Sequence, residues 1–186
     1  PNGTRVLYRK AKGGHIVPST WSREPGIYEV SSRGGKPERV TEDGSRPHFG
    51  ASGEYFFRTT RGKNGPQLVK RDVKTREDIP LFQSKHSTII TVSPDEKWVA
   101  FAENYQAYVF PMVQMGKPIN IGPKMKQLPS RKASVNSASH LHWSGDSSMV
   151  HWSEGPLLMG RSVPALFDTS PKNEDIWTPI QARQDV

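Results

Sequence analysis

The chain has no cysteine among its 186 residues. The absence excludes disulfide bonds, thiolate nucleophiles and cysteine-ligated metals. The sequence also has no apolar run near the roughly 18 residues that a membrane-spanning helix needs, and it has no apolar leader of the secretory kind. We therefore expect no membrane partner. Because the chain starts with a turn and without Met, we expect it to be a piece of a longer protein.

Apolar residues are also few, at 33% of the chain, whereas Gly and Pro each occur 16 times. Such a composition favours many short strands joined by turns over long helices. The formal net charge is +8. The basic residues are scattered among acidic ones, which is typical of a solvated surface, so we expect no nucleic-acid partner.

A four-residue turn signature recurs four times, and an apolar, strand-like run follows it each time. The signatures are PNGT, ASGE, PDEK and GDSS, with third positions at Gly3, Gly53, Glu96 and Ser147. A spacing of roughly 40 to 50 residues is typical of stacked repeats. Asp-Gly at the centre of the turn is replaced in three signatures, and we expect these changes to alter the turn geometry.

The order of the expected strands also repeats, with four short antiparallel strands in each complete unit and three in the unit at each end. They span residues 5–10, 26–31 and 38–41; 46–49, 54–59, 67–73 and 78–83; 87–92, 98–103, 106–112 and 117–121; and 138–143, 149–153 and 156–160. The sequence therefore predicts an all-β fold, a partial β-propeller of about three four-stranded antiparallel blades with an open unit at each end.

Open units leave unpaired strand edges, and a closed propeller ring has about 4 to 8 blades. We therefore expect either an open arc or a partner chain that completes the ring, including a homo-oligomer formed through open blade edges. Residues 1–161 are predicted to form the propeller segment and residues 162–186 a linker that exits toward a further domain. The basic, aperiodic stretch 125–136 is predicted to be a long loop inside a blade.

Three runs resemble the TolB-type, WD40-like (PD40) propeller repeat: GIYEVSSRGGKPERVTEDGSRPHFGASGEYFFR, TVSPDEKWVAFAE and HLHWSGDSSMVHW. The resemblance covers residues 1–160. The stretches 100–112 and 140–160, with the tail 175–186, most resemble the amino-terminal propeller region of amidohydrolase-superfamily proteins.

This resemblance implies a non-catalytic scaffold, docking or access-restricting segment of a larger metal-dependent amidohydrolase. It implies no catalytic residue and no cofactor in this chain, and a divalent metal in the parent enzyme. The partner would be another domain of the parent or a separate protein, in the periplasm or outside the cell. The alternatives are a stand-alone TolB-like interaction module of the bacterial envelope and the gating propeller of a prolyl-oligopeptidase-like serine peptidase.

Histidines at the last hairpin are the best set for chemistry. Counting outward from the turn at 145–148 pairs His142 with His151, and His140 projects from the same face as His142. Three imidazoles on one face are able to hold Zn²⁺. Packing beside Trp143 and Trp152 is the favoured interpretation, so these three histidines remain metal candidates only.

Other patterns are weaker. His48, Thr91 and His142 each precede the last residue of an innermost strand, and we expect these three to face the propeller channel. The chain has no G-x-S-x-G string, and its Gly-Gly pairs do not precede helices, so no serine nucleophile or phosphate loop is predicted. The aromatic residues Trp98, Phe101, Tyr105, Tyr108 and Trp143 are expected to fill the space between blades.

Overall fold

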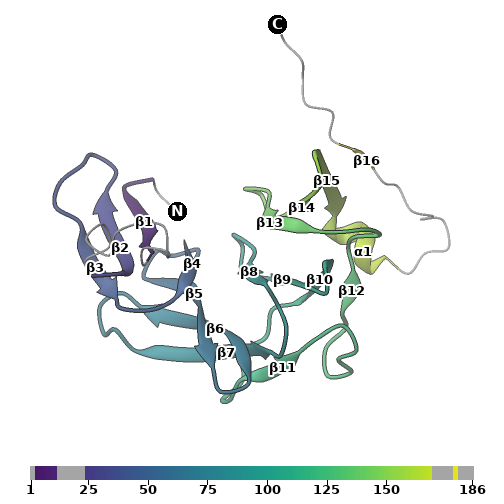
Figure 1. Cartoon of the computed structure of the whole chain (residues 1–186), viewed down its shortest axis with the longest axis horizontal. Helices are drawn as coiled ribbons and strands as arrows, with labels where there is room; N and C mark the ends of the chain where they lie inside the picture. Colours follow the sequence, from purple (N-terminus) through teal and green to yellow (C-terminus); the bar gives the residue numbers. More distant parts are fainter. Residues whose placement is uncertain (1–2, 12–23, 169–177, 180–186) are drawn as a thin grey trace, which may run out of the picture. The chain divides into compact units, whose positions relative to one another are not determined.

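The computed structural model describes residues 3–11, 24–168 and 178–179 (Figure 1). Several sequence features lie wholly or partly outside these ranges: the first turn signature, the Gly-Gly pair at residues 13 and 14, and most of the tail 175–186. The chain divides into two compact units. Unit 1 comprises Pro1–Gln83 and Met115–Ile119, and unit 2 comprises Ser84–Gln114 and Asn120–Val186.

Unit 1 begins with a three-stranded antiparallel sheet in the order β1-β2-β3. The strands are β1 (Arg5–Lys10), β2 (Gly26–Ser31) and β3 (Glu38–Thr41). Its second sheet has the order β11-β7-β6-β5-β4. These strands are β4 (Ser45–Phe49), β5 (Tyr55–Gly62), β6 (Gly65–Asp72), β7 (Asp78–Ser84) and β11 (Ile119–Ile121), the last of which spans the boundary between the two units.

Unit 2 holds two sheets of four strands, ordered β12-β10-β9-β8 and β13-β14-β15-β16. The first contains β8 (Ile89–Val92), β9 (Trp98–Glu103), β10 (Gln106–Pro111) and β12 (Arg131–Lys132). The second contains β13 (Ser139–Trp143), β14 (Met149–Glu154), β15 (Leu157–Ser162) and β16 (Thr178–Pro179). A short helix, α1 (Val163–Phe167), follows β15.

The core of unit 2 is a single buried cluster between these two sheets. Ala100 and Ala102 of β9 belong to it, together with Val150 and Trp152 of β14. Helix α1 contributes Val163, which is fully buried. Small side chains on one sheet therefore accommodate large ones on the next, as close packing of stacked sheets requires.

The turn signatures have one shared geometry. In the three later signatures, the N–H of the third residue donates to the carbonyl of the residue just before the signature: Gly53 to Gly50, Glu96 to Ser93 and Ser147 to Ser144. Those donor residues have φ of 73°, 58° and 65°, a left-handed region that favours glycine. The expectation that the substitutions alter the turn geometry was therefore wrong, because Glu96 and Ser147 adopt the conformation of the glycine.

Two strand assignments differ from the sequence prediction. The three-residue strand β11 joins the sheet of β7, and the fourth strand of the β8-β9-β10 sheet is β12, within the stretch predicted to be a loop. Strands of two or three residues are too short to show an alternating pattern. The all-β fold and the antiparallel sheets of a partial β-propeller are confirmed.

The predicted domain boundary at residues 161 and 162 stays a prediction. In the described part of the tail, α1 packs into the core of unit 2 and β16 pairs with β15. Among the described residues, no helix has the length and apolar character needed to cross a membrane.

Candidate functional site

The predicted pairing of histidines at the last hairpin is confirmed in its register. His142 of β13 lies opposite His151 of β14. Their rings are stacked, with centroids 5.3 Å apart and planes inclined by 29°. Nδ1–H of His142 donates to the carbonyl of His140 at 2.9 Å, which leaves the lone pair of the neutral ring on Nε2.

A register shift separates His140 from this pair. The register shifts between Ser139 and His142, and His140 has a positive φ of 51°. Its Nδ1 lies 3.1 Å from the hydroxyl of Ser153. Within residues 3–11, 24–168 and 178–179, no three His, Cys, Asp or Glu side chains gather as metal ligands. Metal binding by these histidines stays a prediction.

The environment of His151 opposes its charged form. Partial burial lowers the pKa of His151 from its ordinary value, and repulsion from His142 lowers it further. A hydrogen bond with the backbone of Met159 acts in the opposite direction without cancelling the shift. Simultaneous protonation of the two imidazoles is therefore disfavoured.

The three channel candidates occupy comparable places in their sheets. His48 of β4 lies opposite Phe57, with ring centroids 5.3 Å apart, and Thr91 of β8 lies opposite Ala100. With His142, each is the next-to-last residue of the strand that precedes a turn signature. That these side chains face a channel stays a prediction.

Two apolar residues of β1 are exposed at positions that are buried elsewhere. Val6 is 46% exposed and Tyr8 is 36% exposed. Counted from the turn residue with positive φ, Val6 corresponds to Phe56, Val99 and Val150, and Tyr8 corresponds to Arg58, Phe101 and Trp152. All six counterparts are buried. Within the described residues, the face of the first sheet that carries Val6 and Tyr8 thus lacks the cover that the other sheets have.

The same comparison shows which strand has no counterpart in the described part of the first sheet. Strands β5, β9 and β14 follow a turn signature and pair with β4, β8 and β13, respectively, across it. Strand β1 follows the turn at Gly3, which has a φ of 71°, but pairs with β2 alone in the described part of its sheet. The edge of β1 away from β2 is therefore open to another strand.

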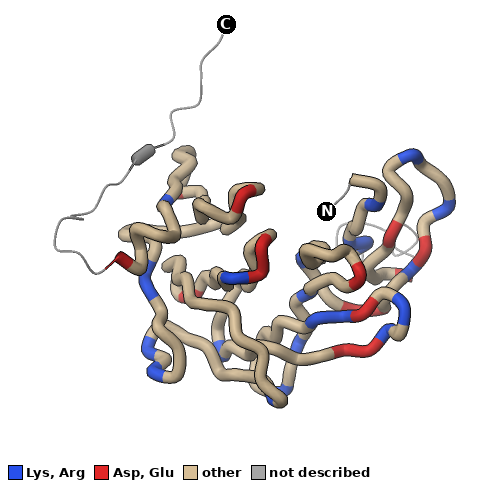
Figure 2. Tube along the Cα trace, turned by 180° about the vertical axis from the view of Figure 1, so that it is seen from behind, with Lys and Arg blue, Asp and Glu red and all other residues tan. Residues whose placement is uncertain are grey.

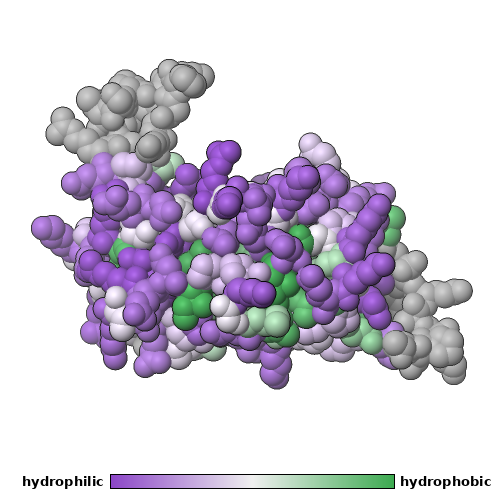
Figure 3. All heavy atoms as spheres, turned by 90° about the horizontal axis from the view of Figure 1, so that it is seen from below, coloured by the Kyte–Doolittle hydropathy of each residue, from purple (hydrophilic) through white to green (hydrophobic). Residues whose placement is uncertain are grey.

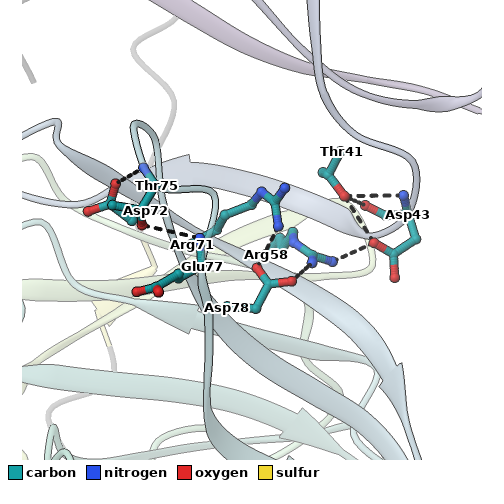
Figure 4. Close-up of polar contacts among 8 residues, drawn as sticks. All are labelled: Thr41, Asp43, Arg58, Arg71, Asp72, Thr75, Glu77 and Asp78. Atoms are coloured by element: carbon teal, nitrogen blue, oxygen red, sulfur yellow. Dashed lines mark hydrogen bonds and ion pairs between the residues drawn. The ribbon is translucent and has the colours of Figure 1, made fainter.

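A second feature of unit 1 is a buried arginine between two carboxylates. Arg58 of β5 is only 4% exposed, and its guanidinium contacts Asp43 and Asp78, each at 2.7 Å (Figure 4). Asp78 also accepts from Arg71 at 3.0 Å. The Asp43 carboxylate is further held by the hydroxyl of Thr41 at 3.0 Å. Two arginines and two aspartates thus compensate one another, as buried charges require.

Beside this network lies a cleft of about 300 Å³ in unit 1. Its apolar lining is formed by Val30, Val40, Phe56 and Val73, and its charged lining by Arg5, Lys36, Arg71, Arg76, Glu29, Glu38 and Asp72. The cleft lies between the first two sheets, at the end where β1 and β5 begin. The sequence does not indicate this cleft, because its lining residues come from five stretches of the chain, at 5, 29–31, 36–40, 56 and 71–76.

The charged surface is otherwise mixed, as the sequence predicts. Lys and Arg are interspersed along the trace with Asp and Glu (Figure 2). Hydrophilic residues dominate the face shown in Figure 3, with apolar residues between them. The prediction that the aromatic residues fill the space between blades is wrong for Tyr105, which is 78% exposed at the tip of the β9–β10 hairpin. Phe101, by contrast, is buried.

Comparison of the structure with solved structures finds β-propeller proteins. TolB from Acinetobacter baumannii matches with a TM-score of 0.59 and 19% identity over 87% of this chain and 39% of that one. A TolB homologue from Agrobacterium tumefaciens matches with a TM-score of 0.55 and 16% identity over 90% of this chain and 54% of that one. This chain thus spans about half or less of these two proteins.

The β-propeller domain of the Trilobed protease from Pyrococcus furiosus also matches, with a TM-score of 0.50 and 10% identity over 100% of this chain and 70% of that one. No protein-family model and no curated protein matches the sequence. At these identities the likeness defines the fold. The chain is thus a β-propeller segment, and its fold is that of TolB-like propellers.

Proposed function

We propose that this chain is a non-catalytic propeller segment that works by binding another polypeptide along its first sheet. The observation that carries the proposal is the exposure of Val6 and Tyr8 at positions buried in all the other sheets. In unit 2, Val150 and Trp152 are covered by the preceding sheet. A polypeptide that pairs with the open edge of β1 and packs over the face of Val6 and Tyr8 would bring the corresponding cover to the first sheet.

The apolar surface of Val6 and Tyr8 supports a binding role. Burying a large apolar side chain contributes about 1.5 to 3 kcal/mol. Two such residues, together with main-chain hydrogen bonds along β1, provide the combination by which added strands are recognised. The chemistry that the partner must offer is an extended strand with an apolar residue opposite Val6, as Phe49, Val92 and Trp143 lie opposite their counterparts.

For the parent protein, we infer a metal-dependent amidohydrolase whose access the propeller restricts. The support is the resemblance of residues 100–112 and 140–160 to the propeller region of that superfamily. The metal would lie in the catalytic domain of the parent. Reading the coding sequence beyond Val186 tests this inference. A strand ending in a His-x-His pair agrees with it, whereas a stop codon or a further turn signature contradicts it.

Two alternatives are favoured by the structural comparisons. The likeness to TolB agrees with a stand-alone interaction module of the envelope, and the likeness to the Trilobed protease propeller agrees with a gating propeller. The gating alternative requires an α/β-hydrolase domain in the same protein, which the same gene sequence would contain. A periplasmic or secreted location follows from the family resemblance and stays an expectation.

The non-catalytic assignment has its own test. The purified chain is incubated with amide, ester and peptide substrates, with and without added Zn²⁺. No turnover above the rate of the heat-denatured chain is expected. Hydrolysis that copurifies with the folded chain and disappears in a His142→Ala, His151→Ala double variant would contradict the scaffold role.

A further inference from the structure

The cleft in unit 1 has the chemistry of a binding site for a carboxylate-bearing peptide. Its lining combines four apolar side chains, Phe56 and three valines, with four cationic ones. Interiors of stacked sheets are normally close-packed. A hollow of about 300 Å³ is instead large enough for one or two amino-acid side chains.

The carboxylates of the lining are already engaged. Glu29 is paired with Arg5 at 3.0 Å. Asp72 accepts the backbone N–H group of Lys74 at 2.8 Å and, within the same turn, that of Thr75 at 2.8 Å, the latter drawn in Figure 4. These internal hydrogen bonds also lower the pKa of Asp72. Neither carboxylate therefore needs a further cation from the cleft.

The cationic side chains of the lining are able to bind a further carboxylate. Lys36 has no ion pair within the described ranges of the chain. Arg71 donates one Nη1 bond to Asp78, which it shares with Arg58. Arg76 contacts Glu38 at 2.9 Å, but both side chains are largely exposed, and such a pair contributes little to stability. The carboxylate of a bound peptide is able to replace Glu38 as the ion-pair partner of Arg76 at a small cost in free energy. The same carboxylate is also able to pair with Lys36.

Arg76 carries a side chain at a backbone position that glycine would occupy with less strain. Arg76 has a φ of 62°, and its N–H donates to the carbonyl of Asp72 at 3.1 Å. In the corresponding turn between β2 and β3, the positive φ values belong to Gly34 and Gly35. A strained non-glycine residue beside a cleft is a common feature of ligand-binding sites.

The geometry points to recognition of an acidic peptide: a Glu or Asp carboxylate bound by Arg76, Lys36 and Arg71, with a neighbouring apolar residue over Phe56. This site is separate from the surface of the proposed function, because Val6 and Tyr8 lie on the opposite face of β1 from Arg5, as strand alternation places them. Failure at the cleft would leave the proposed binding along β1 untouched.

The test is calorimetric titration of the full chain with the capped pentapeptide Ac-Ala-Val-Glu-Val-Ala-NH₂ and with the same peptide carrying Gln in place of Glu. We expect saturable binding of the Glu peptide in the range of about 0.1 to 1 mM, and binding of the Gln peptide at least tenfold weaker. Raising the salt from about 0.05 to 0.5 M should weaken the Glu peptide only.

Variants separate binding from folding. Arg76→Gly removes the guanidinium but suits the positive φ, so we expect at least tenfold weaker peptide binding with no loss of thermal stability. Lys36→Gln should weaken binding less. Arg33→Gln, in the same turn as Lys36 but outside the cleft lining, is the matched control and should bind like the parent chain.

Four results would overturn the inference: no saturable binding of the Glu peptide up to about 5 mM, equal binding of the Glu and Gln peptides, equal losses in R76G and R33Q, or inorganic phosphate competing with the peptide at an equal or lower concentration. The last result would show a general anion site with no preference for a peptide.

Discussion

The backbone N–H of Asp95 donates a 2.9 Å hydrogen bond to the hydroxyl of Ser147, joining two turn signatures of unit 2. Ser147 is buried and has a φ of 65°. Glycine would adopt this conformation without strain but has no hydroxyl group. The serine is therefore explained by the contact between the neighbouring turns.

This relationship predicts the order of two variants. Ser147→Ala keeps the strained backbone and loses the hydrogen bond, which should cost about 1 to 3 kcal/mol of unfolding free energy. Ser147→Gly loses the same bond but relieves about 1 kcal/mol of backbone strain. Urea denaturation should therefore rank the parent chain above S147G, and S147G above S147A. Equal or higher stability of S147A than of S147G would refute the explanation.

The network around Arg58 predicts unequal roles for its two carboxylates. Asp78 contacts both Arg58 and Arg71, whereas Asp43 contacts only Arg58 and is more exposed. Asp78→Asn should lower the unfolding free energy by about 2 to 4 kcal/mol, and Asp43→Asn by about 1 kcal/mol. Denaturation midpoints of the two isosteric variants measure this difference. A larger loss for D43N than for D78N would contradict the arrangement.

The paired histidines predict a pH dependence near neutrality. Because the pKa of His151 is lowered in the folded state, the unfolded chain binds more protons below its ordinary value of 6.5. Stability should fall as the pH drops below about 6.5 and level off once folded His151 is protonated. His151→Gln should remove this contribution to the slope, and His142→Gln should reduce it by removing the repulsion. An unchanged slope in H151Q would be inconsistent with the shift.

At acidic pH, protonation of Asp146 in its turn should dominate the pH dependence of stability. Hydrogen bonds from the Ser144 hydroxyl and from the N–H and hydroxyl of Ser148 lower the pKa of Asp146 to about 2. Its stabilising contribution is complete above its ordinary pKa of 3.8 and is lost as the pH falls toward 2. Asp146→Asn should be less stable than the parent chain at pH 6 and equally stable near pH 2. A difference that persists at pH 2 would count against this origin.

The sequence predicts most of the strands because alternation and turn composition are local. Strands β1, β2, β3 and β9 have the predicted bounds, and His142 lies opposite His151 as counted from the turn. The positive φ that Glu96 and Ser147 share was not predicted, because both residue types disfavour the left-handed region. For Ser147, only its tertiary contact with Asp95 explains the residue type.

The binding features were not predictable in the same way. The sequence shows Val6 and Tyr8 as ordinary residues of an alternating strand, and only the comparison of exposures shows that their face is bare. The partners of Arg58 lie 15 and 20 residues away in the chain, on different elements. A charged residue at a position equivalent to Phe101 was the one available signal, because a buried arginine requires acidic partners.

Self-association through the open edge is a separate prediction. If a second copy pairs along β1, the chain should sediment partly as a dimer at high concentration. Val6→Lys should shift it to monomer, because a charged residue on an exposed strand blocks edge pairing. Lys at the equally exposed position Leu157 of unit 2 is the control. A strictly monomeric parent chain would refute homo-oligomerisation.

The most direct test of the account is hydrogen exchange at β1, measured in this chain alone and in the protein expressed from its complete gene. If a strand covers the open edge, the amides of β1 that point away from β2 should exchange at least tenfold more slowly in the complete protein. Amides of β5 and β9, which are already paired on both sides, should change little. Equal, fast exchange of the β1 amides in both samples would contradict the proposal that the chain works by binding a polypeptide there.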